Sequence, residues 1–415
     1  MRAAQHLRRS AWIAAGFFAM SAGTALADPV TITFWNGFTS SDRPVVESIV
    51  DSFNKSQSDV KVEMTIMPWD VFYQKLLPAY AAKQGPTVAA MDGAQLPGYA
   101  SKGVLAPLDD LYASKDFPAD KLVSAGVNAG LYDGKHFGAP MGVTPTMLYW
   151  NKALFKAAGI ADAPKTWDEW AADAVKLTDV SGADNAKKYG FAIPDHAAIP
   201  QWAILLWGNG ADVVSADGKK STFGDPAAIE AVDYWAKLVV DKHISPVGLG
   251  GVEGDNLFGS GRAAMIVNGP WASAGYTQAG VDFGIANVPA GPKAQANNAV
   301  AIEMVVSAGA TDAQKAAANK FITFWNSVDS QKTFSKTGYP ATRTDVPADQ
   351  LSNPTAQAFA AGATSAHFFL AGVVNYAQIN DTIFTPTIQR ITNGQGTAKD
   401  LLPQASQQID ALLQQ

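Results

Sequence analysis

The sequence contains no cysteine in 415 residues. This absence excludes a catalytic thiol, a metal site built from thiolates and a membrane anchor attached to a lipidated cysteine. An oxidising compartment often brings disulfides to small domains, but a chain of this length is able to bury an adequate core without them. We therefore expect a freely diffusing protein that carries out no thiol chemistry.

Charged residues are also scarce, at 16% of the chain against a typical share of about a quarter. Hydrophobic residues make up 47%, which excludes wholesale disorder and is enough for about two domains of ordinary size. The formal net charge of -6 gives no support to a nucleic-acid partner or to an anionic membrane surface. Beyond residue 27, no apolar run reaches the roughly 18 residues of a membrane-spanning helix, so we expect no membrane anchor.

Common hydrolase motifs are missing as well. The chain has five histidines, no Gly-x-Ser-x-Gly elbow and no His-Glu-x-x-His motif. These absences disfavour serine hydrolases of that type and zinc proteases. We expect no catalytic residues, no metal and no cofactor.

The first 27 residues have the composition of an export signal. Arg2, Arg8 and Arg9 form a basic head, residues 11–20 are an apolar run too short to span a bilayer, and residues 25–27 form a small-residue cleavage site. We expect cleavage after residue 27 and a mature protein in the periplasm. The paired arginines leave twin-arginine export open beside the favoured general secretory route.

The mature sequence begins with an alternation of strands and helices that is typical of a parallel sheet. Residues 30–35 and 60–66 alternate branched and polar side chains, and residues 87–91 form a short apolar strand. Between them, residues 44–53 and 70–82 have helical spacing. This order predicts an α/β lobe in which helices cover a mainly parallel sheet.

From about residue 149 the pattern changes to longer helices, and no flexible linker separates two independent halves. We therefore expect the chain to cross between two interwoven lobes. The spacing predicts strands over 263–267 and 300–307, and helices over 151–158, 167–177, 202–207, 226–240, 312–326, 331–337, 379–392 and 398–413.

Eight short motifs follow one another in the order found in one large family. They are 31–36 (TITFWN), 85–92 (GPTVAAMD), 98–108 (GYASKGVLAPL), 148–152 (LYWNK), 166–170 (TWDEW), 259–265 (GSGRAAM), 268–271 (NGPW) and 337–343 (TGYPATR). On these motifs the mature chain resembles the maltose-binding class of extracellular solute-binding proteins, the receptors of ATP-driven sugar importers. The resemblance covers nearly all of the mature sequence.

The resemblance implies a two-lobed periplasmic binding protein fold, in which each lobe is a mainly parallel sheet flanked by helices and a hinge of two or three strands joins the lobes. It implies a carbohydrate ligand in the cleft, closure around that ligand, and delivery to the permease subunits of an ABC transporter. We expect a monomer with no reaction of its own. The expected segments are a signal peptide at 1–27, an N-terminal lobe at 28–140 and 290–340, a C-terminal lobe at 141–289 and 345–415, and hinge crossings near 139–144, 285–289 and 340–344.

Trp271 ends the NGPW motif, where the family places its stacking aromatic. An indole ring covers the flat C–H face of a sugar, while the sugar hydroxyls need polar partners in the plane of the ring. The alternative is a core tryptophan at the start of the following helix. We expect Trp271 to contact the ligand.

Polar residues end two of the predicted strands. Trp35 and Asn36 end the first strand, and Asp92 follows the third, with Gln95 shortly after it. Open parallel sheets bind ligands at the carboxyl ends of their strands, so we expect these residues at the ligand. The alternatives are an asparagine bonded to its own backbone and an aspartate that caps the next segment. Maltose-binding members have an arginine near the position of Gln95, so a maltodextrin is not expected.

Three more candidates come from later segments. Thr144 stands where maltose-binding members carry a ligand-binding glutamate, which also argues against that ligand. Trp202 and Trp207 lie five residues apart, and we expect Trp202 to face the ligand and the other to pack in the core. Glu303 places a charge on an apolar strand, where a carboxylate needs a polar partner or an exposed strand end.

The last candidates lie near the third expected crossing and beyond it. Tyr339 and Arg343 flank that crossing, and Arg343 would bind hydroxyls or a phosphate, or else hold a carboxylate of the hinge. His367 precedes the last helices, where the family presents further aromatic residues.

Two other functions stay open. The tripeptide at 337–339 resembles the glycerol-phosphate branch of the family, which makes a polyol or glycerol phosphate the alternative ligand. That branch has an arginine near the position of Asn380, where this chain has none. A secreted glycoside hydrolase needs two carboxylates, for which Asp92 and Glu303 are the candidates.

Overall fold

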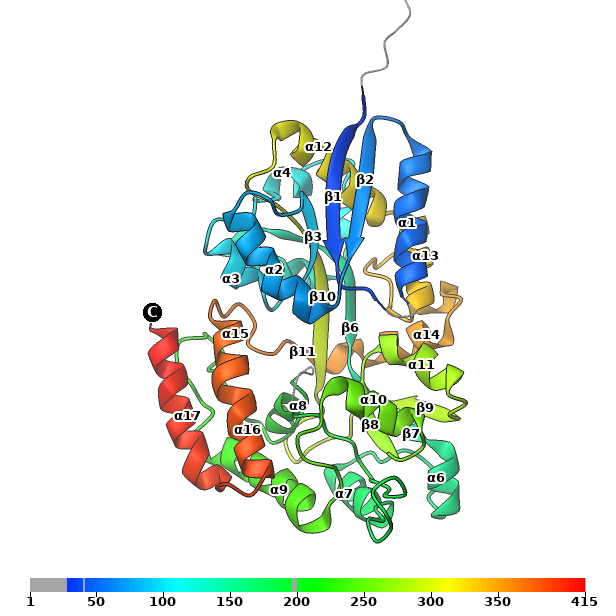
Figure 1. The fold of residues 1–415 in the computed structure, drawn as a ribbon, viewed down its shortest axis with the longest axis vertical. Coiled ribbons are helices and arrows are strands. Elements are labelled where there is room, and N and C mark those ends of the chain that lie inside the picture. Colours follow the sequence, from blue (N-terminus) through cyan, green and yellow to red (C-terminus); the bar gives the residue numbers. More distant parts are fainter. Residues whose placement is uncertain (1–27, 40–41, 196–199, 415) are drawn as a thin grey trace, which may run out of the picture.

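The computed structural model describes residues 28–39, 42–195 and 200–414, and in these ranges the chain forms two lobes, one above the other in Figure 1. The expected export signal at 1–27 lies outside the described residues. None of the helices in the described ranges is both long enough and apolar enough to cross a membrane. The two-lobed α/β architecture expected from the sequence is confirmed.

The upper sheet takes strands from distant parts of the chain. They are β1 (Val30–Asn36), β2 (Val60–Ile66), β3 (Val88–Asp92), β6 (Gly138–Pro145), β10 (Asn297–Val306) and the short β11 (Ala366–His367). β1 pairs in parallel with β2 and β3, whereas β10 is antiparallel to both β3 and β6. The sheet order is β2-β1-β3-β10-β6, and β11 pairs with the start of β10. Ile32 and Phe34 of β1 are fully buried, as the alternating pattern predicts.

Helices cover both faces of the upper sheet. α1 (Arg43–Ser56), α12 (Asp312–Trp325) and α13 (Val328–Phe334) lie on one face, and α2 (Trp69–Ala81) and α3 (Leu96–Ala100) lie on the other. A capping box between Thr311 and Gln314 starts α12. The remaining elements of this lobe are α4 (Asp109–Tyr112), α5 (Ser124–Ala129), β4 (Leu131–Tyr132) and β5 (Lys135–His136).

The lower lobe is built around a smaller sheet, β7 (Met147–Asn151), β8 (Met265–Asn268) and β9 (Phe283–Ala286), in the order β8-β7-β9. Both pairings are antiparallel, where we expected a mainly parallel sheet. The reason is that β7 continues directly from β6 and runs away from the upper lobe, while β8 and β9 run towards it. Parallel pairing is confined to single bridges such as those of Tyr189 with Ala263 and of Ala192 with Ile266.

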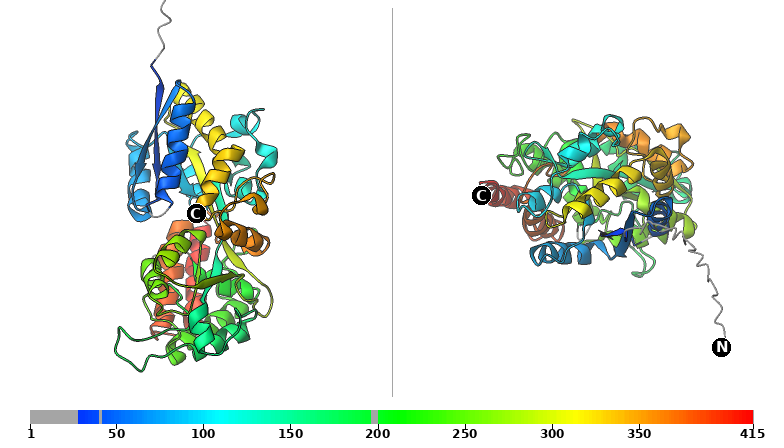
Figure 2. Two further views of the ribbon diagram at one scale, coloured as in Figure 1. Left: turned by 90° about the vertical axis from the view of Figure 1, so that its right-hand side faces the viewer. Right: turned by 90° about the horizontal axis from the view of Figure 1, so that it is seen from above.

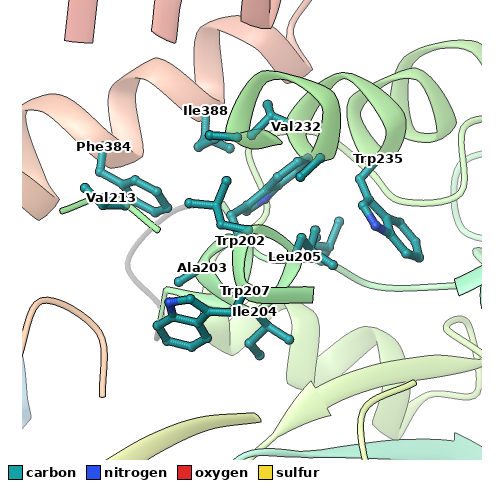
Figure 3. Close-up of a cluster of buried hydrophobic side chains, with 14 of the residues drawn as sticks. Trp202, Ala203, Ile204, Leu205, Trp207, Val213, Val232, Trp235, Phe384 and Ile388 are labelled. Atoms are coloured by element: carbon teal, nitrogen blue, oxygen red, sulfur yellow. The ribbon is translucent and has the colours of Figure 1, made fainter. Parts of the chain in front are cut away.

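Long helices surround this lower sheet (Figures 1 and 2). Their core includes Trp202, Trp235 and Phe384, which lie together in Figure 3. The single helix expected over 379–392 is interrupted by one turn of π-helix, Asn380–Phe384, because Pro386 starts the next helix without a backbone N–H to donate. The helices are α6 (Lys152–Ala157), α7 (Trp167–Lys176), α8 (Gln201–Gly208), α9 (Pro226–Lys242), α10 (Gly251–Gly259), α11 (Ser273–Gln278), α15 (Tyr376–Ile379), α16 (Thr385–Thr392) and α17 (Ala398–Leu413).

Two long strands and one helix connect the lobes. β6 runs through the segment expected at 139–144, and β10 runs beside it with all ten residues buried. Residues 285–289, where we expected a crossing, instead end β9 and pack in the lower core through Val288. Because an apolar strand looks the same whether it ends inside a lobe or leaves it, the sequence does not show that β10 is the crossing.

The third connection lies beyond 340–344. These residues stay in the upper lobe, where the Thr342 carbonyl accepts from Val123 N–H and Thr344 N–H donates to the Lys121 carbonyl. The chain then crosses in α14 (Pro354–Ala361). Ala356 of α14 packs with upper-lobe residues, and Phe359 packs with the lower core.

Candidate ligand-binding site between the lobes

Asp92 ends β3 at the boundary between the lobes. Its Oδ1 accepts the Ala94 N–H at 2.9 Å, and its own N–H donates to the Tyr73 hydroxyl at 2.8 Å. Burial raises the pKa of Asp92 to about 6, and the only opposing influence is the Ala94 N–H rather than a cation. Asp92 is therefore a desolvated carboxyl group that no lysine or arginine of the described ranges neutralises.

The charge of Asp92 influences the pKa of three tyrosines. Tyr73 comes from α2, Tyr339 follows the 3-10 turn Ser335–Thr337, and Tyr376 starts α15 in the lower lobe. Burial raises the pKa of each tyrosine, and the charge of Asp92 raises it further, in Tyr339 together with the charge of Asp42. Of the three, Tyr73 is in direct contact with Asp92, through the bond from the Asp92 N–H to its hydroxyl.

Trp271 lies at the same boundary. It sits in the 3-10 turn Pro270–Ala272 that follows β8, and its partly exposed side chain contacts hydrophobic residues of both the upper and the lower lobe. Its ring centroid lies 6.0 Å from that of Tyr339, with an interplanar angle of 39°. We call Tyr73, Asp92, Trp271, Tyr339 and Tyr376 the interlobe site.

A buried hydrogen-bond network fixes the loop that presents Trp271. Asp255 accepts from the Tyr276 hydroxyl at 2.7 Å and also from the Asn268 side-chain amide. The Tyr149 hydroxyl donates to the Gly269 carbonyl at 2.9 Å and pairs with the Ser273 hydroxyl. The NGPW loop is therefore held at its first two residues, which restrains the position of the indole.

Two predicted residues, Trp35 and Asn36, lie at the end of β1. Asn36 is fully buried; its Oδ1 accepts the Phe38 N–H at 3.2 Å, as in the alternative interpretation, while its Nδ2 has no partner among the described residues. The Trp35 side chain is half-buried and packs against the hydrophobic cluster to which α2 contributes. Gln95 is half-buried directly before α3.

Glu303 is fully buried in β10, beside Gly130 and Gly138. Neither of its carboxylate oxygens has a hydrogen-bond partner among the described residues. Burial raises its pKa well above the usual value, and the charge of Asp92 raises it further. Because Glu303 has no exposed surface, it lies behind the interlobe site instead of lining it.

Three of the other predicted residues, Trp202, Thr144 and Arg343, are packed or hydrogen-bonded elsewhere. Trp202 is 2% exposed in the lower core, and the Thr144 hydroxyl donates to the Pro145 carbonyl at 3.1 Å. Arg343 donates to Asp345 at 2.8 and 2.7 Å and to the Asn326 carbonyl at 2.7 Å, so its guanidinium holds the upper lobe together. His367 is exposed, 5.4 Å from the Trp207 ring. The described residues contain no group of three or more side chains suited to a metal ion.

Tyr73 and Tyr376 are the members of the interlobe site that the sequence did not indicate. Tyr73 lies inside a segment whose helical spacing was recognised, but a tyrosine there is equally typical of a packed helix face. Tyr376 comes near this part of the upper lobe only because the segment before α15 lies against Gly98 of α3. No local pattern signals such a distant contact.

Comparison with known proteins agrees with this architecture. Residues 48–361, more than half of the chain, match the family of bacterial extracellular solute-binding proteins. The chain belongs to this family. A solute-binding protein of known structure, the ABC substrate-binding protein of Listeria monocytogenes in complex with cycloalternan, superposes with a TM-score of 0.84. The two are 23% identical, and the superposition covers 93% of this chain and 100% of the other, so the similarity shows the shared fold.

Curated relatives of this solute-binding protein match mostly over part of their length. A putative binding protein of Brucella abortus is 27% identical over 255 residues, which are 60% of each chain. The galactooligosaccharide-binding protein of Bacillus subtilis is 28% identical over 59% of this chain and 56% of its own. The sn-glycerol-3-phosphate-binding periplasmic protein of Brucella abortus is 24% identical over 78% and 77%. The match with the first two thus spans less than two thirds of their length.

Proposed function

We propose that this solute-binding protein binds a neutral carbohydrate at the interlobe site and delivers it to the membrane permease of an ABC importer. The observation that carries the proposal is Asp92, a desolvated carboxyl group that ends β3 beside the Tyr73 hydroxyl, with no cation partner among the described residues. Sugar hydroxyls donate well to such a carboxylate. Trp271, partly buried between the two lobes, offers an aromatic face for the C–H face of the sugar ring.

The ligand contacts that we propose are Asp92, Trp271 and Tyr339 from the predicted set, together with Tyr73 and Tyr376. Asn36 is a further candidate, since its Nδ2 is an unused donor among the described residues. The mature protein would begin at Asp28, act in the periplasm as a monomer and have no reaction of its own.

Glycerol phosphate is the second candidate ligand, favoured by one relative of that specificity. A phosphate needs cations, and Arg343 is already committed to Asp345 and to the Asn326 carbonyl. Position 380, where the glycerol-phosphate branch has an arginine, is an asparagine that donates to Asp381. The charge of the described site therefore favours a neutral ligand.

A glycoside hydrolase is disfavoured by the position of Glu303. Hydrolysis needs two carboxyl groups on either side of the scissile bond. Asp92 lies at the lobe boundary, but Glu303 has no exposed surface with which to reach a substrate. We therefore propose binding without turnover.

A thermal-shift screen tests the proposal. Mature protein, refolded to remove any carried-over ligand, is heated with neutral sugars, polyols and sugar phosphates. A ligand that binds only the folded state adds about 2.7 kcal/mol of stability at a hundredfold excess over its Kd, so at least one neutral sugar should raise the Tm clearly. A rise with phosphorylated compounds alone would favour glycerol phosphate, and no rise with any compound would contradict a carbohydrate ligand.

Replacing Asp92 with asparagine should weaken binding of that sugar by about 1–1.5 kcal/mol, because hydrogen bonds to a charged group become weaker bonds to a neutral one. Isothermal titration calorimetry measures the change. Asp109→Asn, which alters an exposed carboxylate bonded to His136 in the upper lobe, is the control and should leave the Kd unchanged. Equal affinities of Asp92→Asn and the control would remove Asp92 from the site.

A further inference from the structure

We propose that Thr146 and Asn298 together bind one hydroxyl group of the ligand, at the point where β6 and β10 enter the lower lobe. This inference rests on the proposed function and adds to it two residues that select the ligand. Both residues are buried, with 1% and 2% of their surface exposed. The Thr146 Oγ1 and the Asn298 Oδ1 nevertheless have no hydrogen-bond partner among the described residues.

The two residues are neighbours across the ladder of β6 and β10. Pro145, the last residue of β6, is opposite Ala299. The next residue, Thr146, donates its backbone N–H to the Asn298 carbonyl at 2.6 Å, which continues the same register. Side chains directly opposite each other in an antiparallel pair point to one face, with Cβ atoms about 4.5–5.5 Å apart. The two unpartnered oxygens are therefore close enough for one small group to bridge them.

The contacts of β11 show which face carries this pair. His367 of β11 is the register partner of Asn298, so their side chains point to the same face. The centroid of the His367 ring lies 5.4 Å from that of Trp207 in α8, which places α8 over this face. His367 is exposed, and β11 is an edge strand of the sheet. Asn298 is thus one strand away from an exposed edge.

The same side of β6 faces Tyr339 of the interlobe site. Alternate residues of a strand share a side, so Gly142 and Thr144 point the same way as Thr146, which lies about 13 Å beyond Gly142 along the chain. A Cβ built on Gly142 would lie 3.0 Å from Cδ1 of Tyr339. The Thr144 hydroxyl donates to the Pro145 carbonyl, whereas the Thr146 hydroxyl has no partner among the described residues. A ligand at the interlobe site that follows this side of β6 meets the pair.

The two unpartnered oxygens suit a neutral hydroxyl group. An amide oxygen only accepts hydrogen bonds, and a threonine hydroxyl both donates and accepts. A sugar hydroxyl therefore donates to the Asn298 Oδ1 and accepts from the Thr146 hydroxyl, whereas an ionised phosphate oxygen has no hydrogen to give to Asn298. Buried polar groups without partners cost stability, so closure of the lobes on such a hydroxyl gains the bonds that the fold itself leaves unmade.

Thr146→Val tests the pair with the sugar found by thermal shift. Valine keeps the shape of threonine and removes the hydroxyl, so calorimetry should show about three- to tenfold weaker binding. Thr342→Val is the matched control, because Thr342 is also a buried threonine whose hydroxyl has no partner among the described residues, but it lies in the upper lobe beside Gln331. Thr146→Ser, which keeps the hydroxyl, should recover most of the affinity. Equal affinities of the two valine variants would overturn the proposal.

Deoxy analogues of the same sugar separate a ligand contact from a structural role. The analogue that lacks the bound hydroxyl should bind the unaltered protein less tightly, and Thr146→Val should cost this analogue no further affinity. Weakening of every analogue by the same factor would mean that the hydroxyl acts within the fold, and would overturn the proposal. A sugar bound equally by the unaltered protein and by Thr146→Val would overturn this inference while leaving the carbohydrate proposal intact. Binding of no sugar by the unaltered protein would overturn both.

Discussion

Trp271→Ala is expected to weaken ligand binding by about 1–4 kcal/mol, the range of a buried aromatic anchor. The indole lies between the hydrophobic residues of the two lobes and beside Tyr339, so its removal takes away a proposed ligand contact and an interlobe contact together. The fold should persist, because Asp255 and Tyr149 hold the loop independently of the indole. Calorimetry with the sugar found by thermal shift measures the loss.

Two further variants separate binding from folding. Trp271→Phe keeps an aromatic face and should recover most of the affinity. Trp202→Ala removes a side chain that is 2% exposed in the lower core, and should lower the free energy of unfolding by about 3–5 kcal/mol. An unchanged Kd for Trp271→Ala would show that this tryptophan serves packing alone.

The stability of the ligand-free protein is expected to fall as the pH rises above about 4.5, and Glu303→Gln should reduce this fall. In the folded protein, burial and the charge of Asp92 hold the pKa of Glu303 well above its usual value, about 4.3 in an unfolded chain. Below the unfolded pKa, the group is protonated in both states and costs nothing. As the pH rises towards the folded pKa, the unfolded state ionises first, and each unit of pKa difference then costs about 1.4 kcal/mol of stability.

Urea unfolding at intervals between pH 4.5 and 8 measures this slope. Asp92 and Asp255, whose pKa values burial raises to about 6, contribute with the same sign, so the slope of the Glu303→Gln variant is reduced but not abolished. The comparison uses the slope because the new amide is also unpartnered and lowers stability at every pH. Glu253→Gln, on the exposed side of α10, should keep the slope of the unaltered protein. A slope for Glu303→Gln equal to that of the unaltered protein would mean that the carboxyl group is hydrated and ionised in the fold.

The sequence predicts the first half of the upper lobe closely because its signals are local. The alternation over 30–35 and 60–66 reappears as β1 and β2, and the expected helix over 312–326 becomes α12. Placing a strand relative to the lobes is harder. Residues 300–307 were recognised as a strand, yet their apolar pattern does not show that β10 joins the lobes.

The residues of the site also differ in whether a local sequence pattern marks them. Asp92 and Trp271 were predicted because a strand end and a family motif mark them in the sequence. Glu303 was recognised as an unusual charge, but only the fold shows that it is buried behind Asp92. Arg343 and Asp345 are two residues apart, and nothing in their spacing shows that they bind each other instead of a ligand.

The position of β10 in the sheet has a consequence for the order in which the chain becomes folded. β10 lies between β3 and β6, so the upper sheet lacks the strand that joins them until residues 297–306 have been synthesised. By then the chain has already supplied most of the lower lobe. We therefore expect the N-terminal segments to complete their sheet only after residue 306 has been made, because contacts this distant in sequence form slowly. A chain that stays unfolded while it is made is suited to threading through a membrane channel before it folds.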